Sequence, residues 1–347
     1  MCMYFTRGIK QDGYMLCRQC KKNKDMHPIF IYLYDTTSQC DDVVLLIQEY
    51  IKNDLYQTIS GKYKHTITLS QGFVKCWGNN SFGQCIVPDS IQGNVISIST
   101  GYYHSVALLN NNTIKCWGRN DHNQCIPPDS IQGRIISVSC GENFSCALLD
   151  DNTVRCWGNN WHKGFDISNS VQGKVVSIEC ADYYFYALLN NNTVEYYGHV
   201  LDTCIPNSIQ GKVISISGGE THSGALLNDG TIKFWGDNSD GQCDPPDSIQ
   251  GNNHNVNINN DNVVGKVVSI ECGVYYSGAI LNDMTVRCWG NNDLGQCDIP
   301  ESIQGKVVSI SLGHYCSSAV LNNNTIECWG SNWLEDEHPL KGPHVKR

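Results

Sequence analysis

The sequence predicts an all-β protein, a seven-bladed β-propeller made of repeats of about 40 residues. The first observation behind this prediction is a phrase of the type Cys-Trp-Gly that returns seven times along the chain. The successive returns are separated by 40, 40, 40, 38, 54 and 40 residues. The second observation is that each unit contains short segments with strand patterning and no helical periodicity. The aromatic residue of the phrase, which we expect to have a structural role in every repeat, is Trp77, Trp117, Trp157, Tyr197, Trp235, Trp289 or Trp329.

The second unit, residues 94–133, shows the expected order of elements. Its residues 95–99 alternate apolar and polar side chains, as a half-buried strand does, and a glycine then marks a tight turn. Residues 104–109 predict a more apolar second strand, and 113–117 a third. Three asparagines separate these two strands, and Asn favours turns because it tolerates left-handed backbone. The prolines and the Ser-Ile-Gln-Gly that follow predict a loop, which could include a short outer strand.

Seven such sheets are expected to close into a ring. A sheet of three or four strands cannot cover both of its own faces, so neighbouring blades must cover each other. An open β-solenoid is the alternative, but its coils usually have shorter periods. We place the propeller at residues 54–337. An Asn-rich insertion at 252–264 accounts for the 54-residue interval, and it is predicted to be a disordered loop.

Two segments lie outside the repeats, an N-terminal extension at 1–53 and a C-terminal tail at 338–347. The extension is predicted to be a short α+β or irregular segment. Residues 41–55 begin with two acidic side chains and then repeat apolar positions at helical spacing. This pattern suggests a helix that caps the first blade.

The extension also contains a Cys-x-x-Cys motif. Cys17 and Cys20 have the spacing of half a zinc site, and Cys2, His27 and Cys40 could supply further ligands. The chain has no second pair with this spacing. The sequence therefore favours thiols that bind no metal, and no cofactor is expected.

The charge balance limits the classes of partner. The chain has 34 acidic and 24 basic side chains and a formal net charge of −10, whereas nucleic acids and anionic membranes attract basic surfaces. No secretory signal peptide is recognisable, and no apolar run is long enough to span a bilayer. We therefore expect an intracellular protein, cytoplasmic or nuclear, that is monomeric and binds neither nucleic acid nor membrane.

Most of the 19 cysteines recur at fixed positions of the repeat. The slot before Trp-Gly is Cys in five units and Tyr or Phe in the other two, which indicates an apolar packing position. With no secretory signal, reduced core thiols are the favoured interpretation, and disulfides throughout the propeller are the alternative. Cys146 and Cys316 lie outside the recurring positions.

The repeat resembles that of the regulator of chromosome condensation family. Gly101-Tyr102-Tyr103-His104 with Ala107-Leu108 matches the first half of that motif, and residues 77–84, Trp-Gly-Asn-Asn-Ser-Phe-Gly-Gln, match the second. The resemblance covers residues 54–337 and implies a seven-bladed propeller. The short blades are similar to those of bacterial and viral members, including propellers that inhibit β-lactamases. Together with the high Asn and Ile content, they suggest a viral or microbial source. The third unit departs from the motif, because Asn160-Trp161-His162-Lys163 replaces the Gly-Gln segment.

The connection between the first and second strands is the candidate site. In a propeller these seven connections emerge at one end, and loops on a rigid scaffold commonly carry binding. The position after the glycine is Lys62, Tyr102, Glu142, Asp182, Glu220, Val274 or His314, and the next is Tyr63, Tyr103, Asn143, Tyr183, Thr221, Tyr275 or Tyr315. Five tyrosines would form a ring in the second of these rows, and tyrosines are frequent at protein interfaces. The alternative is that they pack between blades. The candidate partner-binding residues are Tyr63, Tyr102, Tyr103, Asp182, Tyr183, Glu220, Tyr275, His314 and Tyr315.

Nothing in the sequence predicts catalysis. The slot of His104 and His222 also holds Phe144, Tyr184 and Tyr276, which indicates a structural position. The chain lacks a phosphate-binding loop, a His-Glu-x-x-His motif and a Gly-x-Ser-x-Gly motif.

The predicted function is a non-catalytic protein-interaction module that recognises a protein partner through loops at one end of the ring. The resemblance implies three alternatives. One is a guanine-nucleotide exchange factor whose partner is a small GTPase, although the insertion at 252–264 offers a single acid, Asp261, for such a role. The others are an enzyme inhibitor and a substrate-recruiting arm for ubiquitin ligation.

Overall fold

The structure is a computed structural model that describes residues 58–160, 165–198, 205–250 and 265–331. The N-terminal extension with Cys17 and Cys20, the helix expected at 41–55, the insertion at 252–264 and the tail at 338–347 lie outside the described residues. The helices within the described ranges are short 3-10 turns, and none could span a bilayer.

The described residues form seven three-stranded antiparallel sheets, which confirms the predicted seven-bladed propeller. Each blade uses three strands consecutive in sequence. They are β1 (Thr58–Gly61), β2 (His65–Ser70) and β3 (Phe73–Gly78); β4 (Val95–Thr100), β5 (His104–Leu109) and β6 (Ile114–Gly118); β7 (Ile135–Cys140), β8 (Phe144–Leu149) and β9 (Val154–Gly158); β10 (Val175–Cys180), β11 (Tyr184–Leu189) and β12 (Val194–Gly198); β13 (Val213–Gly218), β14 (His222–Leu227) and β15 (Ile232–Gly236); β16 (Val267–Cys272), β17 (Tyr276–Leu281) and β18 (Val286–Gly290); and β19 (Val307–Leu312), β20 (Cys316–Leu321) and β21 (Ile326–Gly330).

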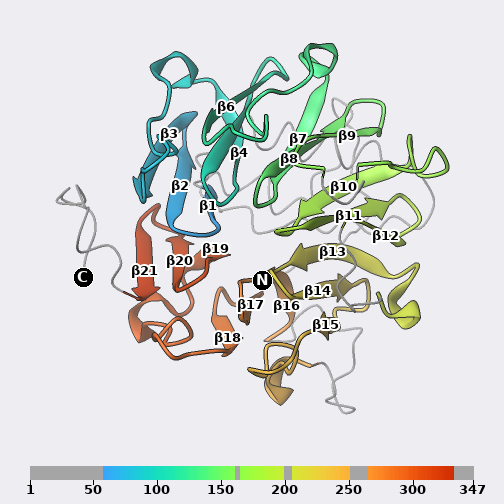
Figure 1. The fold of residues 1–347 in the computed structure, drawn as a ribbon. Coiled ribbons are helices and arrows are strands. Elements are labelled where there is room, and N and C mark those ends of the chain that lie inside the picture. Colours follow the sequence, from blue (N-terminus) through green and yellow to red (C-terminus); the bar gives the residue numbers. More distant parts are fainter. Residues whose placement is uncertain (1–57, 161–164, 199–204, 251–264, 332–347) are drawn as a thin grey trace, which may run out of the picture.

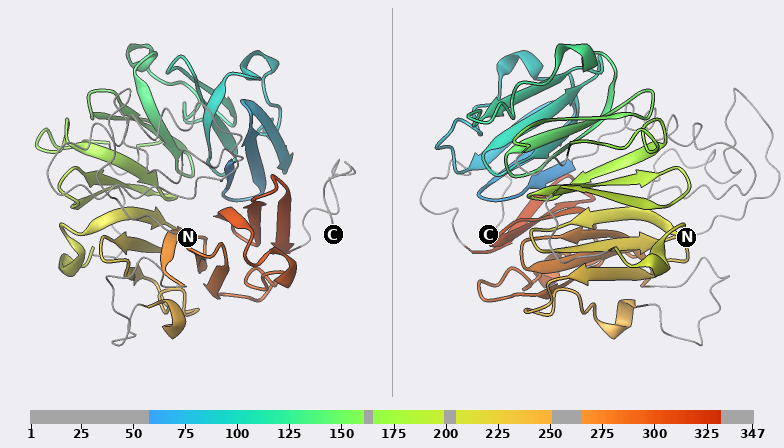
Figure 2. Two further views of the ribbon diagram at one scale, coloured as in Figure 1. Left: turned by 180° about the vertical axis from the view of Figure 1, so that it is seen from behind. Right: turned by 45° about the vertical axis from the view of Figure 1, so that its right-hand side comes forward.

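The first strand of each blade lies nearest the ring axis. These inner strands contact one another in sequence order, and β1 contacts β19, so the first blade lies beside the last (Figures 1 and 2). The contact between them includes a hydrogen bond of 2.9 Å from the Gly61 amide to Ser311 Oγ. Within the described residues, the ring therefore closes without a strand exchanged between these two blades.

The recurring Ser-Ile-Gln-Gly forms a 3-10 turn rather than an outer strand. These turns follow five of the blades and are η1 (Asp89–Ile91), η2 (Asp129–Ile131), η3 (Asn207–Ile209), η4 (Asp247–Ile249) and η5 (Glu301–Ile303). The glutamine takes over the pairing that a fourth strand would provide. Gln92 Oε1 accepts a hydrogen bond from the Val74 amide at 2.8 Å, and its Nε2 donates to the Val74 carbonyl at 2.9 Å. The same two bonds recur with Gln172, Gln210 and Gln304.

The repeated tryptophans join adjacent blades. The Trp117 indole donates a hydrogen bond of 2.8 Å to the carbonyl of Gln84 in the preceding blade's loop, and Ser105 Oγ donates to the same carbonyl. The bond from the indole recurs at Trp157, Trp289 and Trp329. Since an unpaired buried polar group costs about 1–3 kcal/mol, each Trp-to-carbonyl bond fixes how one blade docks on the next.

The histidine slot is structural. His104 is fully buried, and its Nε2 lies 2.9 Å from Ser145 Oγ in the next blade, while His222 Nε2 lies 2.8 Å from Ser277 Oγ. Tyr276 replaces His in the sixth blade and places its hydroxyl 3.0 Å from Ser317 Oγ. The imidazole of His and the phenol of Tyr therefore make the same contact between blades.

Two cysteines depart from the expectation of reduced thiols. Cys146 and Cys156 face each other on β8 and β9 with their Cα atoms 4.0 Å apart, and they form a disulfide. In the other repeats the position of Cys146 holds Ile, Val, Tyr, Gly or Ser, so no second cysteine faces the one on the third strand there. Twelve further cysteines in the described ranges are free, as predicted.

Candidate functional site

All the connections considered as a site lie at one end of the ring, which we call the loop face. Because His104 pairs with Gly118, the start of the second strand and the end of the third lie at this end, together with the loops that follow the third strand. The turns between second and third strands lie at the opposite end, the turn face. One of these turns contains Asn112, which has the left-handed φ of 61° that its sequence predicts.

In the first blade, the loop positions assigned from the sequence are shifted by one residue relative to the other blades. The Lys64 carbonyl accepts the hydrogen bond from Asn79 that the Tyr103 carbonyl accepts from Arg119 in the second blade. Tyr63 is therefore equivalent to Tyr102 rather than to Tyr103, and His65 rather than Lys64 occupies the histidine slot. The cause is the hairpin between β2 and β3, which is one residue shorter than its counterparts.

The tyrosines form an asymmetric cluster rather than an even ring. Tyr63 lies at its centre, stacked on Tyr102 with ring centroids 4.6 Å apart and on His314 at 5.4 Å. Tyr103 meets the edge of Tyr63 at 5.6 Å. We call this set, contributed by blades 1, 2, 6 and 7, the aromatic cluster; its members are Tyr63, Phe82, Tyr102, Tyr103, Tyr275, His314 and Tyr315.

Arg119 extends the aromatic cluster outward. Its guanidinium lies 5.1 Å from the ring of Phe82 and 5.6 Å from that of Tyr103, and it also pairs with Asp121 at 2.6 Å. Phe82 is 47% exposed, so this edge of the cluster is open to a partner. A cavity of about 50 Å³ lies beside the cluster between the first and seventh blades, lined in part by Tyr63, Lys64 and Tyr315.

Lys62 reaches across the ring axis. It occupies the place of Gly101 in the second blade, and its Nζ donates hydrogen bonds to the carbonyls of Cys140 at 2.9 Å and Cys180 at 2.6 Å, in blades 3 and 4. The same Nζ lies 3.8 Å from Asp182 Oδ1. The Tyr102 hydroxyl donates to Asp182 Oδ2 at 2.5 Å. Blades 1, 2, 3 and 4 are thereby tied together at the axis.

The opposite half of the loop face is acidic. Glu142, Asp182 and Glu220 follow one another on blades 3, 4 and 5, with the exposed Tyr183 beside them. Burial, together with the charges of Asp182 and Glu142, raises the pKa of Glu220 to about 7. Burial also raises the pKa of Asp182, although Lys62 acts in the opposite direction. The loop face thus has an aromatic half with basic groups and an acidic half.

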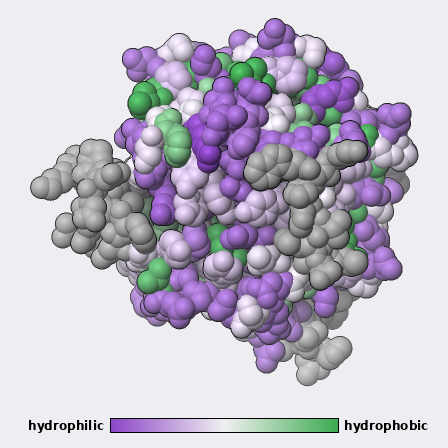
Figure 3. All heavy atoms as spheres, in the orientation of Figure 1, coloured by the Kyte–Doolittle hydropathy of each residue, from purple (hydrophilic) through white to green (hydrophobic). Residues whose placement is uncertain are grey.

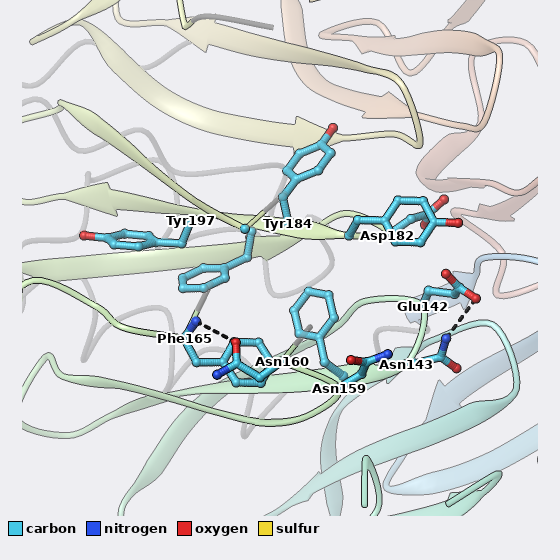
Figure 4. Close-up of a pocket in the computed structure, with 12 residues that line it drawn as sticks. Glu142, Asn143, Asn159, Asn160, Phe165, Asp182, Tyr184 and Tyr197 are labelled. Carbon is cyan, nitrogen blue, oxygen red and sulfur yellow. Dashed lines mark hydrogen bonds between the residues drawn. The ribbon is translucent and has the colours of Figure 1, made fainter. Parts of the chain in front are cut away.

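A cavity of about 200 Å³ lies between blades 3 and 4 (Figure 4). Phe165 and Tyr197 lie at one end of it, and Glu142 and Asp182 lie at the other. Asn143 lines it as well, and its Nδ2 donates to Glu142 Oε1 at 2.8 Å. The cavity therefore has an aromatic end and an acidic end.

The structure separates the candidate residues by exposure. Tyr102 and Asp182 are buried and hold the axis together, whereas Tyr63, Tyr103, Glu220, Tyr275, His314 and Tyr315 are half-buried and Tyr183 is exposed. Sequence reasoning missed Phe82, Arg119 and Glu142 as candidates. Phe82 and Arg119 lie in the loops after Cys-Trp-Gly, where the repeats also differ, so comparison of those loops could have revealed them.

Among the described residues, no three His, Cys, Asp or Glu side chains are grouped as metal ligands would be. In the view of Figure 3, hydrophobic residues are scattered over a largely hydrophilic surface. Within the described chain, the aromatic cluster and the cavity between blades 3 and 4 are the features that best fit a binding role.

Comparison with known proteins agrees with the fold. The model of the regulator of chromosome condensation (RCC1) repeat matches residues 95–124, 135–163 and 213–242. The chain carries these repeats in its second, third and fifth blades. No curated protein matches the sequence.

Several solved structures have the same shape. The CRINKLY WD40 ectodomain of the Arabidopsis thaliana receptor kinase ACR4 is 21% identical, with a TM-score of 0.59 over 80% of this chain and 97% of that one. Human WBSCR16 is 18% identical, with a TM-score of 0.58 over 75% and 85% of the two chains. Prp20p from Saccharomyces cerevisiae is 15% identical, with a TM-score of 0.57 over 74% and 80%. At these identities the likeness establishes the propeller fold alone.

Proposed function

We propose that this propeller of regulator of chromosome condensation repeats is a non-catalytic module that binds a protein partner through its loop face. The observation that carries the proposal is the aromatic cluster. Seven aromatic side chains from four blades gather on one side of the propeller axis, and Tyr63 contacts three of the others. Large aromatic side chains on a rigid scaffold contribute much contact area and lose little conformational entropy on binding.

The charges around the cluster support a role in selectivity. Arg119 and Lys64 lie beside the aromatic rings, and Glu142 and Glu220 lie on the opposite half. A partner with complementary charges would bind in one orientation, because like charges brought together cost several kcal/mol. The small cavity beside Tyr63 could receive one apolar side chain of that partner.

Replacing Tyr63 with alanine is expected to weaken partner binding about 30-fold or more, the effect of losing a central aromatic anchor worth about 2 kcal/mol. Wild type and Tyr63→Ala would each be used to capture partners from lysate, and the affinity of a captured partner would be measured by titration. Phe73→Ala is the matched control, because Phe73 is 55% exposed but begins β3 at the turn face.

The three proteins must first show the same circular dichroism spectrum. Partner capture by wild type and Phe73→Ala, with loss for Tyr63→Ala, supports the loop face as the interface. Equal affinity for all three proteins would overturn the assignment and direct attention to the turn face.

The identity of the captured protein also distinguishes the alternative functions. Prp20p was characterised for its binding to Gsp1p and histones. If the partner of this chain is a small GTPase, release of its bound nucleotide would be timed with and without the propeller. Acceleration would favour an exchange factor over a passive module.

A further inference from the structure

The junction between blades 3 and 4 lacks the Ser and Trp side chains that most of the other blades present to the preceding one. At four other junctions a Gln carbonyl from one blade accepts hydrogen bonds from a Ser hydroxyl and a Trp indole of the next, as Gln124 does with Ser145 and Trp157. In the fourth blade these two donors are replaced by Phe185 and Tyr197. Among the described residues of this junction, no Ser hydroxyl or Trp indole is therefore present to bind a carbonyl of the preceding loop. A cavity of about 200 Å³ lies there instead.

Aromatic rings from both blades form the walls of this cavity. Phe144 and Phe165 of the third blade have centroids 5.5 Å apart, and Phe185 and Tyr197 of the fourth are stacked at 5.1 Å. All four line the cavity. Such walls suit an alkyl chain, and their faces attract a cation through the ring quadrupole.

The acidic end has acceptors available for a donor. Glu142 lines the cavity and takes part in no ion pair within the described chain, whereas the charge of Asp182 faces Lys62. Asn143 is only 9% exposed, lines the cavity, and its Oδ1 has no hydrogen-bond partner among the described residues. A buried acceptor without a partner costs free energy that a bound N–H group would recover.

We propose that this cavity binds the side chain of a lysine or arginine presented by the protein partner. Its alkyl stem would lie between Phe165 and Tyr197, and its cationic head would reach Glu142 and Asn143. The proposal rests on the proposed function, because it supplies the chemistry of the partner's segment: one basic residue that enters the cavity on the acidic half of the loop face, across the ring from the aromatic cluster.

Glu220 does not line the cavity, but its charge interacts with those of Asp182 and Glu142, which do. Its pKa of about 7 reflects burial and the repulsion of Asp182 and Glu142, and the charge of Glu220 in turn raises the pKa of Tyr275. Tyr183 faces the same acids, and Lys62 faces Asp182. A bound cation would relieve the repulsion, so cation binding is expected to strengthen as pH rises from 6 to 8 and Glu220 ionises.

The probes are Nα-acetyl-arginine amide and Nα-acetyl-lysine amide, compared with their neutral analogues Nα-acetyl-citrulline amide and Nα-acetyl-norleucine amide. Binding to the full chain would be followed by ligand-observed NMR titration at pH 8. We expect saturable binding of at least one cationic probe, about tenfold tighter than its neutral analogue, as the loss of one charge-assisted hydrogen bond implies.

Glu142→Gln is expected to abolish the preference for the cation, since it removes the charge and keeps the shape. Asp166→Asn is the matched control, because Asp166 is exposed and does not line the cavity. Equal binding of charged and neutral probes, no saturable binding, or an unchanged preference in Glu142→Gln would each overturn the proposal.

Competition with the captured partner identifies the source of the cation. Displacement of the partner by the cationic probe supports a side chain of that partner. A probe that binds without displacing it would indicate a free small-molecule cation and overturn the assignment to a partner residue. The probe titration needs no partner, so it can succeed or fail independently of the Tyr63→Ala test of the interface.

Discussion

Lys62→Met is expected to lower the free energy of unfolding by about 3 kcal/mol, because removing one partner of a buried charge pair leaves the other uncompensated. The Lys62 ammonium holds the carbonyls of Cys140 and Cys180 and faces the buried Asp182. Methionine keeps most of the aliphatic length and removes the charge and the three donors. Urea denaturation followed by tryptophan fluorescence would measure the change.

A second substitution separates charge from packing. Adding Asp182→Asn to Lys62→Met is expected to restore part of the lost stability, because a neutral amide beside the Tyr102 hydroxyl needs no counter-charge. If Lys62→Met alone changes the unfolding free energy by less than about 0.5 kcal/mol, the typical scale of an uninvolved surface substitution, Lys62 does not tie the blades together at the axis.

The second large effect concerns the buried histidines. Burial lowers the pKa of His104 to about 3 and those of His65 and His222 to about 4. Below the ordinary histidine pKa of about 6.5, the unfolded chain takes up protons that the folded chain does not. The stability that each neutral histidine contributes is therefore present above about pH 6.5 and is lost as the pH falls toward 4.

His104→Tyr isolates one of these groups. Tyr184 and Tyr276 fill the equivalent slot in other blades and contact the same serine position, so the variant keeps the bond between blades but does not titrate in this range. Between pH 7 and pH 4.5 its stability relative to wild type is expected to rise by about 3 kcal/mol, from 1.36 kcal/mol per pH unit below 6.5.

The difference between the two proteins is the useful quantity, because other groups titrate in the opposite sense. Burial raises the pKa of Glu179 to about 7 and that of Glu271 to about 8, so the folded chain takes up protons there as the pH falls. Denaturation midpoints of wild type and His104→Tyr at several pH values give the difference directly. A difference that does not vary with pH would show that His104 is not held neutral by burial.

The repeat period and the strand patterning within each unit were sufficient to predict the architecture. The Cys-Trp-Gly phrase identifies the blades, and the apolar second strand of each unit, such as β5, is the most buried strand of its sheet. What these patterns could not predict is how the outer edge of each blade's third strand finds its hydrogen-bond partners. That depends on side-chain geometry, because Gln92 substitutes for a strand by pairing with the Val74 backbone.

The candidate site was predicted in outline and not in arrangement. The sequence placed the variable tyrosines at one end of the ring, but a shift of one residue in the hairpin before β3 moved Tyr63 into the row of Tyr102. The prediction from the sequence also included Asp182 as a binding residue, although its side chain is buried against Tyr102 and Lys62. Such contacts connect blades that are far apart in sequence, and no local pattern encodes them.

The most direct test of recognition through the loop face is hydrogen–deuterium exchange of the wild-type chain with and without its captured partner. Binding through the loop face should slow exchange in the connections at 62–64, 101–103 and 313–315, which carry most of the aromatic cluster. Backbone amides in the turns at 71–72 and 110–112 should be unaffected. Protection confined to those turns, with none at the loop face, would show that the partner binds at the turn face instead.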